Sequence, residues 1–205
     1  MPALAYARTM GTGPVDFGAL SWPLRTRRTS LRPVAPGDRE AVHSYRSRED
    51  VTTYLSRGPM SLSDVDERLA ENFERSTPGH PNPLLGMVIE VDATVVGDCM
   101  VRFAPDDNGM RIAFIGYALH PDNAGQGLAT EVAEALVRLC FTELGAAMVQ
   151  ADVFAPNRTS QRVLEKVGLR RIGFTAAGSE GGGRPRMDDY LYAVTAAEWA
   201  ASHTS

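Results

Sequence analysis

Residues 115–131 of this 205-residue chain read IGYALHPDNAGQGLATE, and this stretch decides the fold. An apolar strand pattern ends at Leu119, and a turn with Gly125 and Gly127 follows before an amphipathic helix pattern begins. The first turn of a helix carries about four unpaired N–H groups and about half a positive charge. Because glycines have no side chains, a ligand can approach the backbone there closely. The stretch therefore predicts a phosphate or diphosphate site; an ordinary turn with a helix cap is the alternative.

Two common phosphate motifs do not fit this turn. The P-loop requires Gly-Lys followed by serine or threonine, and the chain's single lysine, Lys166, lies elsewhere. The dinucleotide fingerprint requires a third glycine where Thr130 stands, and it follows the first strand of a βαβ unit. Here the turn follows a predicted antiparallel meander, so a dinucleotide-binding domain is disfavoured.

Hydrophobic periodicity predicts the elements around the turn. Before it, we expect a strand at 29–34, helices at 39–48 and 61–75, and antiparallel strands at 86–91, 95–103 and 111–119. After it, we expect a helix at 127–144, a strand at 147–154, a helix at 157–167, and strands at 170–175 and 189–194. Asp107-Asn108-Gly109 is a strong hairpin turn signal. Asp38 is a predicted cap of the first helix, and Ser61 or Ser63 of the second. This order predicts an α+β domain with one strand–helix–strand crossover.

The composition is that of a globular protein, with 43% hydrophobic residues and a formal net charge of −4. The length fits one domain, and we expect an irregular leader at 1–23, the domain at 24–197 and a tail at 198–205. The net charge disfavours a broad nucleic-acid-binding surface. No apolar run approaches the roughly 20 residues of a membrane span, and no signal peptide is recognisable. We therefore predict a cytoplasmic protein without a nucleic-acid or membrane partner.

The cysteines and histidines predict neither a disulfide framework nor a metal site. Cys99 and Cys140 each lie in an apolar run, where a buried free thiol is the expected state. The four histidines are scattered without metal-ligand spacing, so we predict no bound metal.

Four segments occur in the order and spacing of one enzyme family. They are Leu31-Arg32-Pro33 with Asp38, Ile115-Gly116-Tyr117, Gly125-x-Gly127-x-Ala129-Thr130-Glu131, and Asn157-x-x-Ser160-x-x-Val163-Leu164-Glu165-Lys166-Val167-Gly168-Leu169. Together they make residues 25–195 resemble the GNAT superfamily of N-acetyltransferases, in the branch that contains the ribosomal-protein N-terminal alanine and serine acetyltransferases. The family's diphosphate loop, Gln/Arg-x-x-Gly-x-Gly/Ala, is matched at Gly127 and Ala129, and the chain departs from it at Ala124.

The resemblance implies a central twisted sheet, mixed but mostly antiparallel, of six to seven strands with about four helices. Two middle strands, which end near Leu119 and Phe154, part from each other, and the pantetheine arm of coenzyme A lies between them. The implied co-substrate is acetyl-CoA, with no metal. The implied cofactor-binding residues are Leu119, Ala124, Gly125, Gln126, Gly127, Leu128, Ala129, Thr130, Asn157 and Ser160.

The resemblance also implies direct attack of an amine on the thioester, without an acyl-enzyme. The backbone N–H near Leu119 is the implied oxyanion donor. Asn157 is implied to hydrogen-bond the cofactor or a water, and Ser160 to protonate the leaving thiolate. From residue type alone both roles stay open, because Asn157 is also a good helix N-cap and Ser160 readily satisfies local backbone groups. Tyr117 either lines the acceptor groove or packs within the sheet.

No general base is identified by the sequence. Phe114 stands where many relatives carry a glutamate. Asp98, Asp152 and His120 are the remaining candidates, and a structural role is the alternative for each. Glu131 is assigned to stabilising the positive end of its helix. An α-amine of pKa about 8 costs about 1.4 kcal/mol to deprotonate at pH 7, whereas a lysine costs about 4.6 kcal/mol. We therefore expect an α-amino or other low-pKa acceptor.

The expected function is acetyl-CoA-dependent N-acetyl transfer to a primary amine of a protein N-terminus or a small molecule. The alternative is a non-catalytic acyl-CoA-binding protein on the same fold, which Phe114 and Ala124 keep open. Arg57, Arg184 and Arg186 flank the expected acceptor opening, where they attract an acidic substrate or are simply solvated. Exposed sheet edges leave a homodimer open as well.

Overall fold

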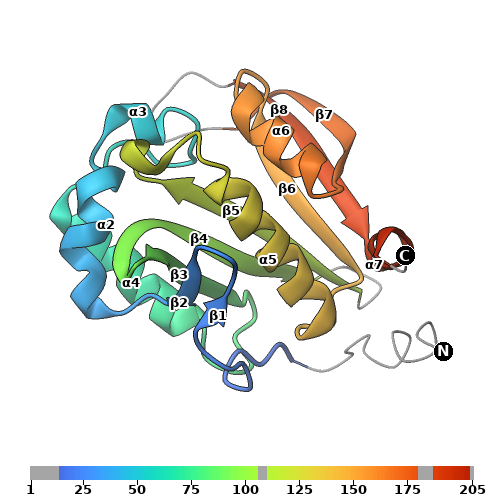
Figure 1. Cartoon of the computed structure of the whole chain (residues 1–205), viewed down its shortest axis with the longest axis horizontal. Coiled ribbons are helices and arrows are strands. Elements are labelled where there is room, and N and C mark those ends of the chain that lie inside the picture. Colours follow the sequence, from blue (N-terminus) through green and yellow to red (C-terminus); the bar gives the residue numbers. More distant parts are fainter. Residues whose placement is uncertain (1–13, 106–109, 180–186, 204–205) are drawn as a thin grey trace.

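The protein, seen in a computed structural model, is described over residues 14–105, 110–179 and 187–203. These residues form one eight-stranded sheet in the order β1-β2-β3-β4-β5-β6-β8-β7, flanked by helices (Figure 1). The strands are β1 (Leu24–Arg25), β2 (Ser30–Pro33), β3 (Leu84–Val91), β4 (Thr94–Pro105), β5 (Arg111–Leu119), β6 (Met148–Phe154), β7 (Arg170–Ser179) and β8 (Met187–Thr195). The helices are η1 (Pro36–Asp38), α2 (Arg39–Arg46), α3 (Glu49–Thr52), α4 (Leu62–Arg75), η2 (Pro121–Asn123), α5 (Leu128–Thr142), α6 (Arg158–Lys166) and α7 (Ala196–Ser202).

The expected antiparallel meander is confirmed in β3, β4 and β5. Met87 of β3 lies opposite Cys99 of β4, which lies opposite Tyr117 of β5. The turn signal at 107–109 falls outside the described residues. The expected six to seven strands become eight because β1 adds a two-residue strand, in which Leu24 pairs with Leu31. Two residues are too few to carry a hydrophobic period, so the sequence pattern missed this strand.

Helices α3 and α7 exceed the four that were expected. The single turn of α3 is too short for a periodic pattern, but α7 did carry a signal. Thr195 and Glu198 form a capping box, in which Glu198 N–H donates to Thr195 Oγ1 at 3.3 Å and Thr195 N–H donates to Glu198 Oε2 at 2.9 Å. The helix was therefore predictable from this Thr-x-x-Glu spacing.

Asp38 precedes α2 as expected, but its side chain does not cap that helix. Its carboxylate accepts two hydrogen bonds of 2.8 Å from the Arg32 guanidinium and one of 2.8 Å from the N–H of Ala35. The Leu-Arg-Pro motif and the aspartate thus form an ion pair that joins β2 to the start of α2. Ser61 caps α4, with its Oγ accepting from the N–H of Asp64 at 3.2 Å.

The helices cover opposite faces of the sheet. Met87 and Ile89 of β3 pack with Val132 and Leu136 of α5, whereas Val88 between them packs with residues of α2 and α4. Because successive strand residues point to opposite faces, α5 lies on one face and α2 with α4 on the other. Two residues of the expected leader, Val15 and Phe17, are buried in the larger cluster.

The sheet opens between β5 and β6. These parallel strands pair only through Ile112–Phe114 and Met148–Gln150. Beyond these pairs, β6 continues beside β8 as far as Phe154, and β5 continues beside β4 as far as Leu119. Figure 1 shows the two strands diverging toward the end of the sheet where α3 and α6 lie. The divergence places a gap in the hydrogen-bonded sheet beside the start of α5.

Candidate functional site

The glycine turn leaves the start of α5 bare. Gly127 is the N-cap residue and has a φ of +80°, and Gly125 has a φ of +75°. This left-handed conformation costs a glycine little. A Cβ added at Gly125 would meet no atom within 4 Å. The first N–H groups of α5 therefore border open space, as a site for an anion requires.

A cavity of about 460 Å³ lies beside this turn. Its size is within the range of small-molecule sites. The end of β5, the glycine turn, α5, α6 and the segment 50–55 all contribute to its wall. Of the residues predicted from the sequence, it is lined by Leu119, Ala124, Gly125, Gly127, Leu128, Ala129, Thr130, Asn157 and Ser160.

Gln126, the remaining predicted residue, contacts the protein itself. Its carbonyl oxygen accepts from Arg28 Nη1 at 2.8 Å, and its side-chain Nε2 donates to the carbonyl of Asp122 at 3.2 Å. Both contacts hold the shape of the turn.

Two hydroxyl groups meet inside the cavity. The Oη of Tyr117 lies 3.1 Å from the Oγ of Ser160, and burial raises the pKa of Tyr117 to about 12. Asn157 Oδ1 accepts from the N–H of Ser160 at 3.1 Å, so the asparagine is the N-cap of α6. This cap fixes the serine at the cavity wall, facing the end of β5.

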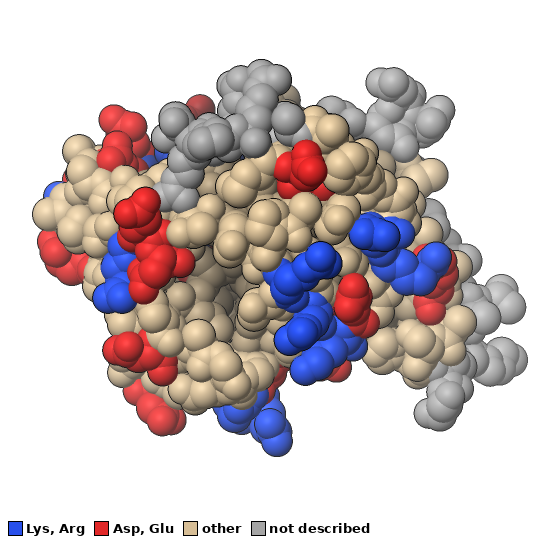
Figure 2. All heavy atoms as spheres, turned by 90° about the horizontal axis from the view of Figure 1, so that it is seen from above, with Lys and Arg blue, Asp and Glu red and all other residues tan. Residues whose placement is uncertain are grey.

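One side of the cavity is cationic. Arg162 and Lys166 of α6 line it, and within the described part of the chain neither forms an ion pair. Figure 2 looks onto this end of the sheet and shows a hollow with Lys and Arg side chains gathered along one side. On the opposite side, Asp50 is paired with Arg48, which lowers the pKa of that carboxyl. The free positive charges favour an anionic ligand.

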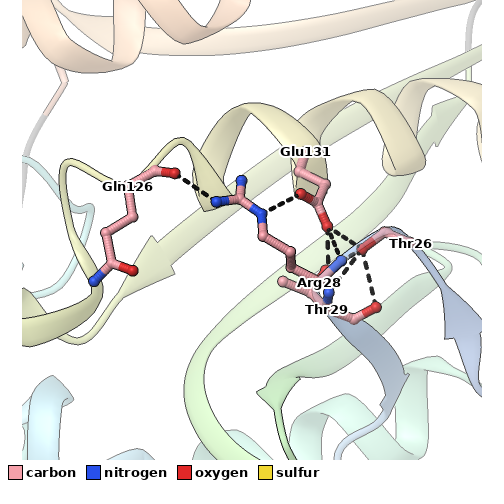
Figure 3. A network of polar contacts seen from close by, with 5 residues as sticks. All are labelled: Thr26, Arg28, Thr29, Gln126 and Glu131. Atoms are coloured by element: carbon pink, nitrogen blue, oxygen red, sulfur yellow. Dashed lines mark hydrogen bonds and ion pairs between the residues drawn. The ribbon is translucent and has the colours of Figure 1, made fainter.

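Glu131 anchors the glycine turn to the N-terminal part of the chain, as Figure 3 shows. Its Oε1 accepts from the hydroxyl of Thr26 and from the N–H of Arg28, the latter at 2.7 Å. Its Oε2 accepts from Arg28 Nε at 2.9 Å, while Arg28 Nη1 donates to the carbonyl of Gln126. Sequence reasoning missed this network because its two halves lie about 100 residues apart and no local pattern links them.

The network shifts the acidity of Glu131. Burial by itself raises the pKa of this carboxyl, but the hydrogen bonds from Thr26 and Arg28 outweigh it and lower the pKa to about 2. The carboxylate thus remains charged at neutral pH and holds Arg28 against the turn. Its role is larger than the helix-end stabilisation assigned from the sequence.

The three base candidates lie in different environments. Asp98 accepts from Arg46 Nε at 2.9 Å; burial alone would raise the pKa of Asp98, but Arg46 and Arg68 lower it below its ordinary value. His120 accepts from the N–H of Asp122, and its ring and that of Tyr45 form a T-shaped pair. Both therefore have structural partners.

Asp152 is the candidate that stays open. It lies on β6 two residues beyond Gln150, which is opposite Phe114. The side chains of Asp152 and Phe114 therefore point to the same face of the sheet, where the strands part. Its Oδ2 is 4.0 Å from Arg102 Nη2, and partial burial raises the pKa of the Asp152 carboxyl. A raised pKa suits a proton acceptor.

Three further expectations concern the arginines at the acceptor opening, metal sites and membrane-spanning helices. Arg57 is about half exposed and lies 3.4 Å from Glu71, whereas Arg184 and Arg186 fall outside the described residues. Within the described residues, no group of three or more His, Cys, Asp or Glu side chains has the geometry of a metal site. None of the helices described is both long and apolar enough to span a membrane.

Comparison with known proteins identifies the family of the chain. A family model described as an acetyltransferase (GNAT) domain matches residues 28–170. The chain is also 28% identical over 178 residues to a Bacillus licheniformis protein named uncharacterized N-acetyltransferase p20. That alignment covers 86% of this chain and 98% of the relative.

Solved structures share the fold at lower identity. Mycobacterium smegmatis RimJ, in complex with CoA-disulfide, matches with a TM-score of 0.73 at 24% identity, over 88% of this chain and 92% of RimJ. Spermidine N-acetyltransferase from Vibrio cholerae, in complex with CoA and spermine, matches with a TM-score of 0.70 at 18% identity, over 84% of this chain and 98% of that protein.

Replacing Glu131 tests the anchor of the turn. Because the folded-state pKa is lowered, the carboxylate stabilises the protein above pH 4.5, and this contribution is lost as the pH falls from 4.5 toward 2. Glu131→Gln should lower the free energy of unfolding at pH 7 by about 2 kcal/mol, and its difference from the unaltered protein should narrow by pH 3. Urea unfolding at pH 7, 5 and 3 measures this.

Glu134→Gln is the matched control, one turn further along α5 and exposed. It should change the free energy of unfolding by less than about 0.5 kcal/mol at each pH. Equal effects of the two substitutions would contradict the anchoring role.

Proposed function

Since this chain belongs to the GNAT acetyltransferase family, we propose that it transfers the acetyl group of acetyl-CoA to an α-amine of a peptide or small molecule. The observation that carries the proposal is the cavity at the end of β5, where β5 and β6 have parted, beside a helix start that two glycines leave bare. The family makes the chain an N-acetyltransferase. The identity of the acceptor and the roles of individual residues are proposed here.

The residues of the cavity suit coenzyme A. The N–H groups from Gly125 to Thr130 would hold the diphosphate, with Arg162 and Lys166 adding positive charge. The free edges of β5 and β6 carry backbone groups that the amides of pantetheine can pair with. Acetyl-CoA supplies an activated thioester, and RimJ and the spermidine enzyme, each solved with a CoA ligand, support this choice.

The chemistry requires one bond to form and one to break. The amine nitrogen attacks the thioester carbon, so a C–N bond forms and the C–S bond breaks. The nitrogen loses one proton and the sulfur gains one, which balances the reaction. The N–H of Leu119 is the proposed oxyanion donor, and Ser160, hydrogen-bonded to Tyr117, is the proposed donor to sulfur.

The acceptor is proposed to be an α-amine because the described residues that line the cavity include no unpaired carboxylate. Asp50 lines the wall but is paired with Arg48. Deprotonating an amine of pKa about 8 at pH 7 costs about 1.4 kcal/mol, whereas deprotonating a lysine costs about 4.6 kcal/mol. Water or the half-exposed Asp152 can therefore accept a proton more easily from an α-amine than from a lysine.

Adding a carboxylate to the turn tests cofactor binding. In the variant Gly125→Asp, the backbone can keep its left-handed conformation, because aspartate adopts this conformation more readily than most residues. The added charge should weaken binding of CoA at least tenfold by calorimetry, because it repels the diphosphate. Gly79→Asp is the control, at a φ of +80° with open space around it in the loop before β3. An unchanged affinity in Gly125→Asp would contradict the proposed site.

Removing a hydroxyl tests proton donation to sulfur. Ser160→Ala and Tyr117→Phe should each lower kcat by about a hundredfold or more, as the loss of an acid catalyst does. Their affinity for CoA should change less than about threefold, measured by calorimetry beside a thiol-release assay. Tyr190→Phe on β8 removes a hydroxyl outside the cavity and is the control. Retained kcat in both variants would assign the hydroxyl pair to structure alone.

Acceptor acidity is tested with two peptides that differ in the amine they offer. One has a free N-terminus and no lysine, and the other is acetyl-capped and carries an internal lysine. We expect turnover of the free N-terminus to exceed that of the lysine at pH 7, because its amine is neutral at lower cost. Faster turnover of the lysine peptide would refute the α-amine proposal. Binding of CoA without turnover of any amine would favour the acyl-CoA-binding alternative.

A further inference from the structure

A second cavity adjoins the first. It measures about 280 Å³ and shares Leu55 and Tyr117 with the cofactor cavity as lining residues. Its floor is formed by Asp98 and Met100 of β4 and by Gly116 of β5, on the sheet face that α2 and α4 cover. A group bound there lies next to the Tyr117 end of the gap between β5 and β6, where the thioester is proposed to sit.

Positive charge dominates this second cavity. Among the described residues, two carboxylates line it, Glu71 and Asp98, against four guanidinium groups, those of Arg46, Arg57, Arg68 and Arg102. The formal charge of the lining residues is therefore +2 in a chain whose net charge is −4. A cavity of this sign attracts anions and repels cations.

The two carboxylates are already engaged. Asp98 is held by both ends of the Arg46 guanidinium, one contact being 2.9 Å from Nε. Glu71 accepts from Arg75 Nη1 at 2.8 Å and from Arg57 Nη2 at 3.4 Å. Neither carboxylate is therefore free to form a two-bond ion pair with another guanidinium.

Among the described residues, Arg68 is the least exposed guanidinium of this cavity that lacks a close ion-pair partner. Its Nη2 is 3.8 Å from Asp98 Oδ2, which is too long for a hydrogen bond, although its side chain is only 24% exposed. A guanidinium carries five N–H donors. Burial, followed by the nearby charges of Arg46 and Arg57, lowers the pKa of Arg68, while Asp98 opposes this effect. Because Asp98 is shared with Arg46 and does not hydrogen-bond Arg68, a second anion would stabilise this partly buried cation further.

We infer that the second cavity binds an anionic group of the acceptor, so that the substrate is an amine that also carries a carboxylate, held by Arg68 with Arg57 at the rim. This inference rests on the proposed function and names its substrate class. Guanidinium–carboxylate pairs are favourable and directional. A polyamine, which carries several positive charges and no negative one, is a poor fit for the same cavity.

Matched acceptors test the inference in a thiol-release assay with the full chain and acetyl-CoA. One arm compares the amidated peptides Ser-Glu-Ala and Ser-Gln-Ala, and the other compares free serine with serinamide. We expect kcat/KM to be at least tenfold higher for the carboxylate-bearing member in one arm, mainly through a lower KM. A preference in the first arm indicates an acidic side chain near a peptide N-terminus, and a preference in the second indicates the α-carboxylate of a free amino acid.

Variants assign the preference to Arg68. Arg68→Gln should reduce the ratio of kcat/KM for acidic and neutral acceptors to within about twofold, and Arg68→Lys should restore part of it. Arg39→Gln removes a partly exposed arginine that pairs with Asp66 on α4, outside the cavity, and should leave the ratio unchanged. Thermal unfolding of each variant identifies any that fails to fold.

Two outcomes would overturn the inference. One is equal turnover of acidic and neutral acceptors, and the other is a preference that survives in folded Arg68→Gln. If CoA binds and no amine is turned over, the proposed function fails, and calorimetry with the N-acetylated Glu and Gln peptides then decides the inference. Tighter binding of the Glu peptide, lost in Arg68→Gln, supports the anion site, and equal binding refutes it.

Discussion

The parting of β5 and β6 is the constraint on which the site depends. Each strand keeps a full partner on its outer side, β4 or β8, and the two share only three residue pairs. The backbone groups on their free inner edges need hydrogen-bond partners. The proposed ligand, coenzyme A, has amides that can supply them, and the glycine turn at the same end can receive its diphosphate. One gap in the sheet thus fixes both the place and the chemistry of the cavity.

The gap is useful only if α5 begins at a fixed point, and a distant contact fixes it. Glu131 in the first turn of α5 holds Arg28, and Arg28 holds the carbonyl of Gln126 in the turn itself. The negative charge also lies at the positive end of the helix. The loop between β1 and β2 is therefore a structural support of the proposed cofactor site, although it does not line the cavity.

Local signals in the sequence predicted much of this structure, and distant pairings were beyond them. The meander, α5 and the bare turn follow from periodicity and from Gly125 and Gly127. Strand β1 exists only because Leu24 finds Leu31, and the Glu131–Arg28 pair joins residues about 100 positions apart. Asp98 illustrates the same limit, since an aspartate in a strand pattern gives no sign of the arginine that neutralises it.

The arginines of the second cavity also bear on the missing base. Phe114 offers no carboxylate to take the proton from the acceptor, and Arg102 stacks on its ring with the guanidinium carbon 3.9 Å from the ring centre. Nearby positive charge disfavours an ammonium ion and so lowers the pKa of a bound amine. In the proposed acceptor, a carboxylate paired with Arg68 away from the reacting nitrogen would offset this repulsion during binding. The charges proposed to select the substrate would therefore also favour the neutral amine that attacks the thioester.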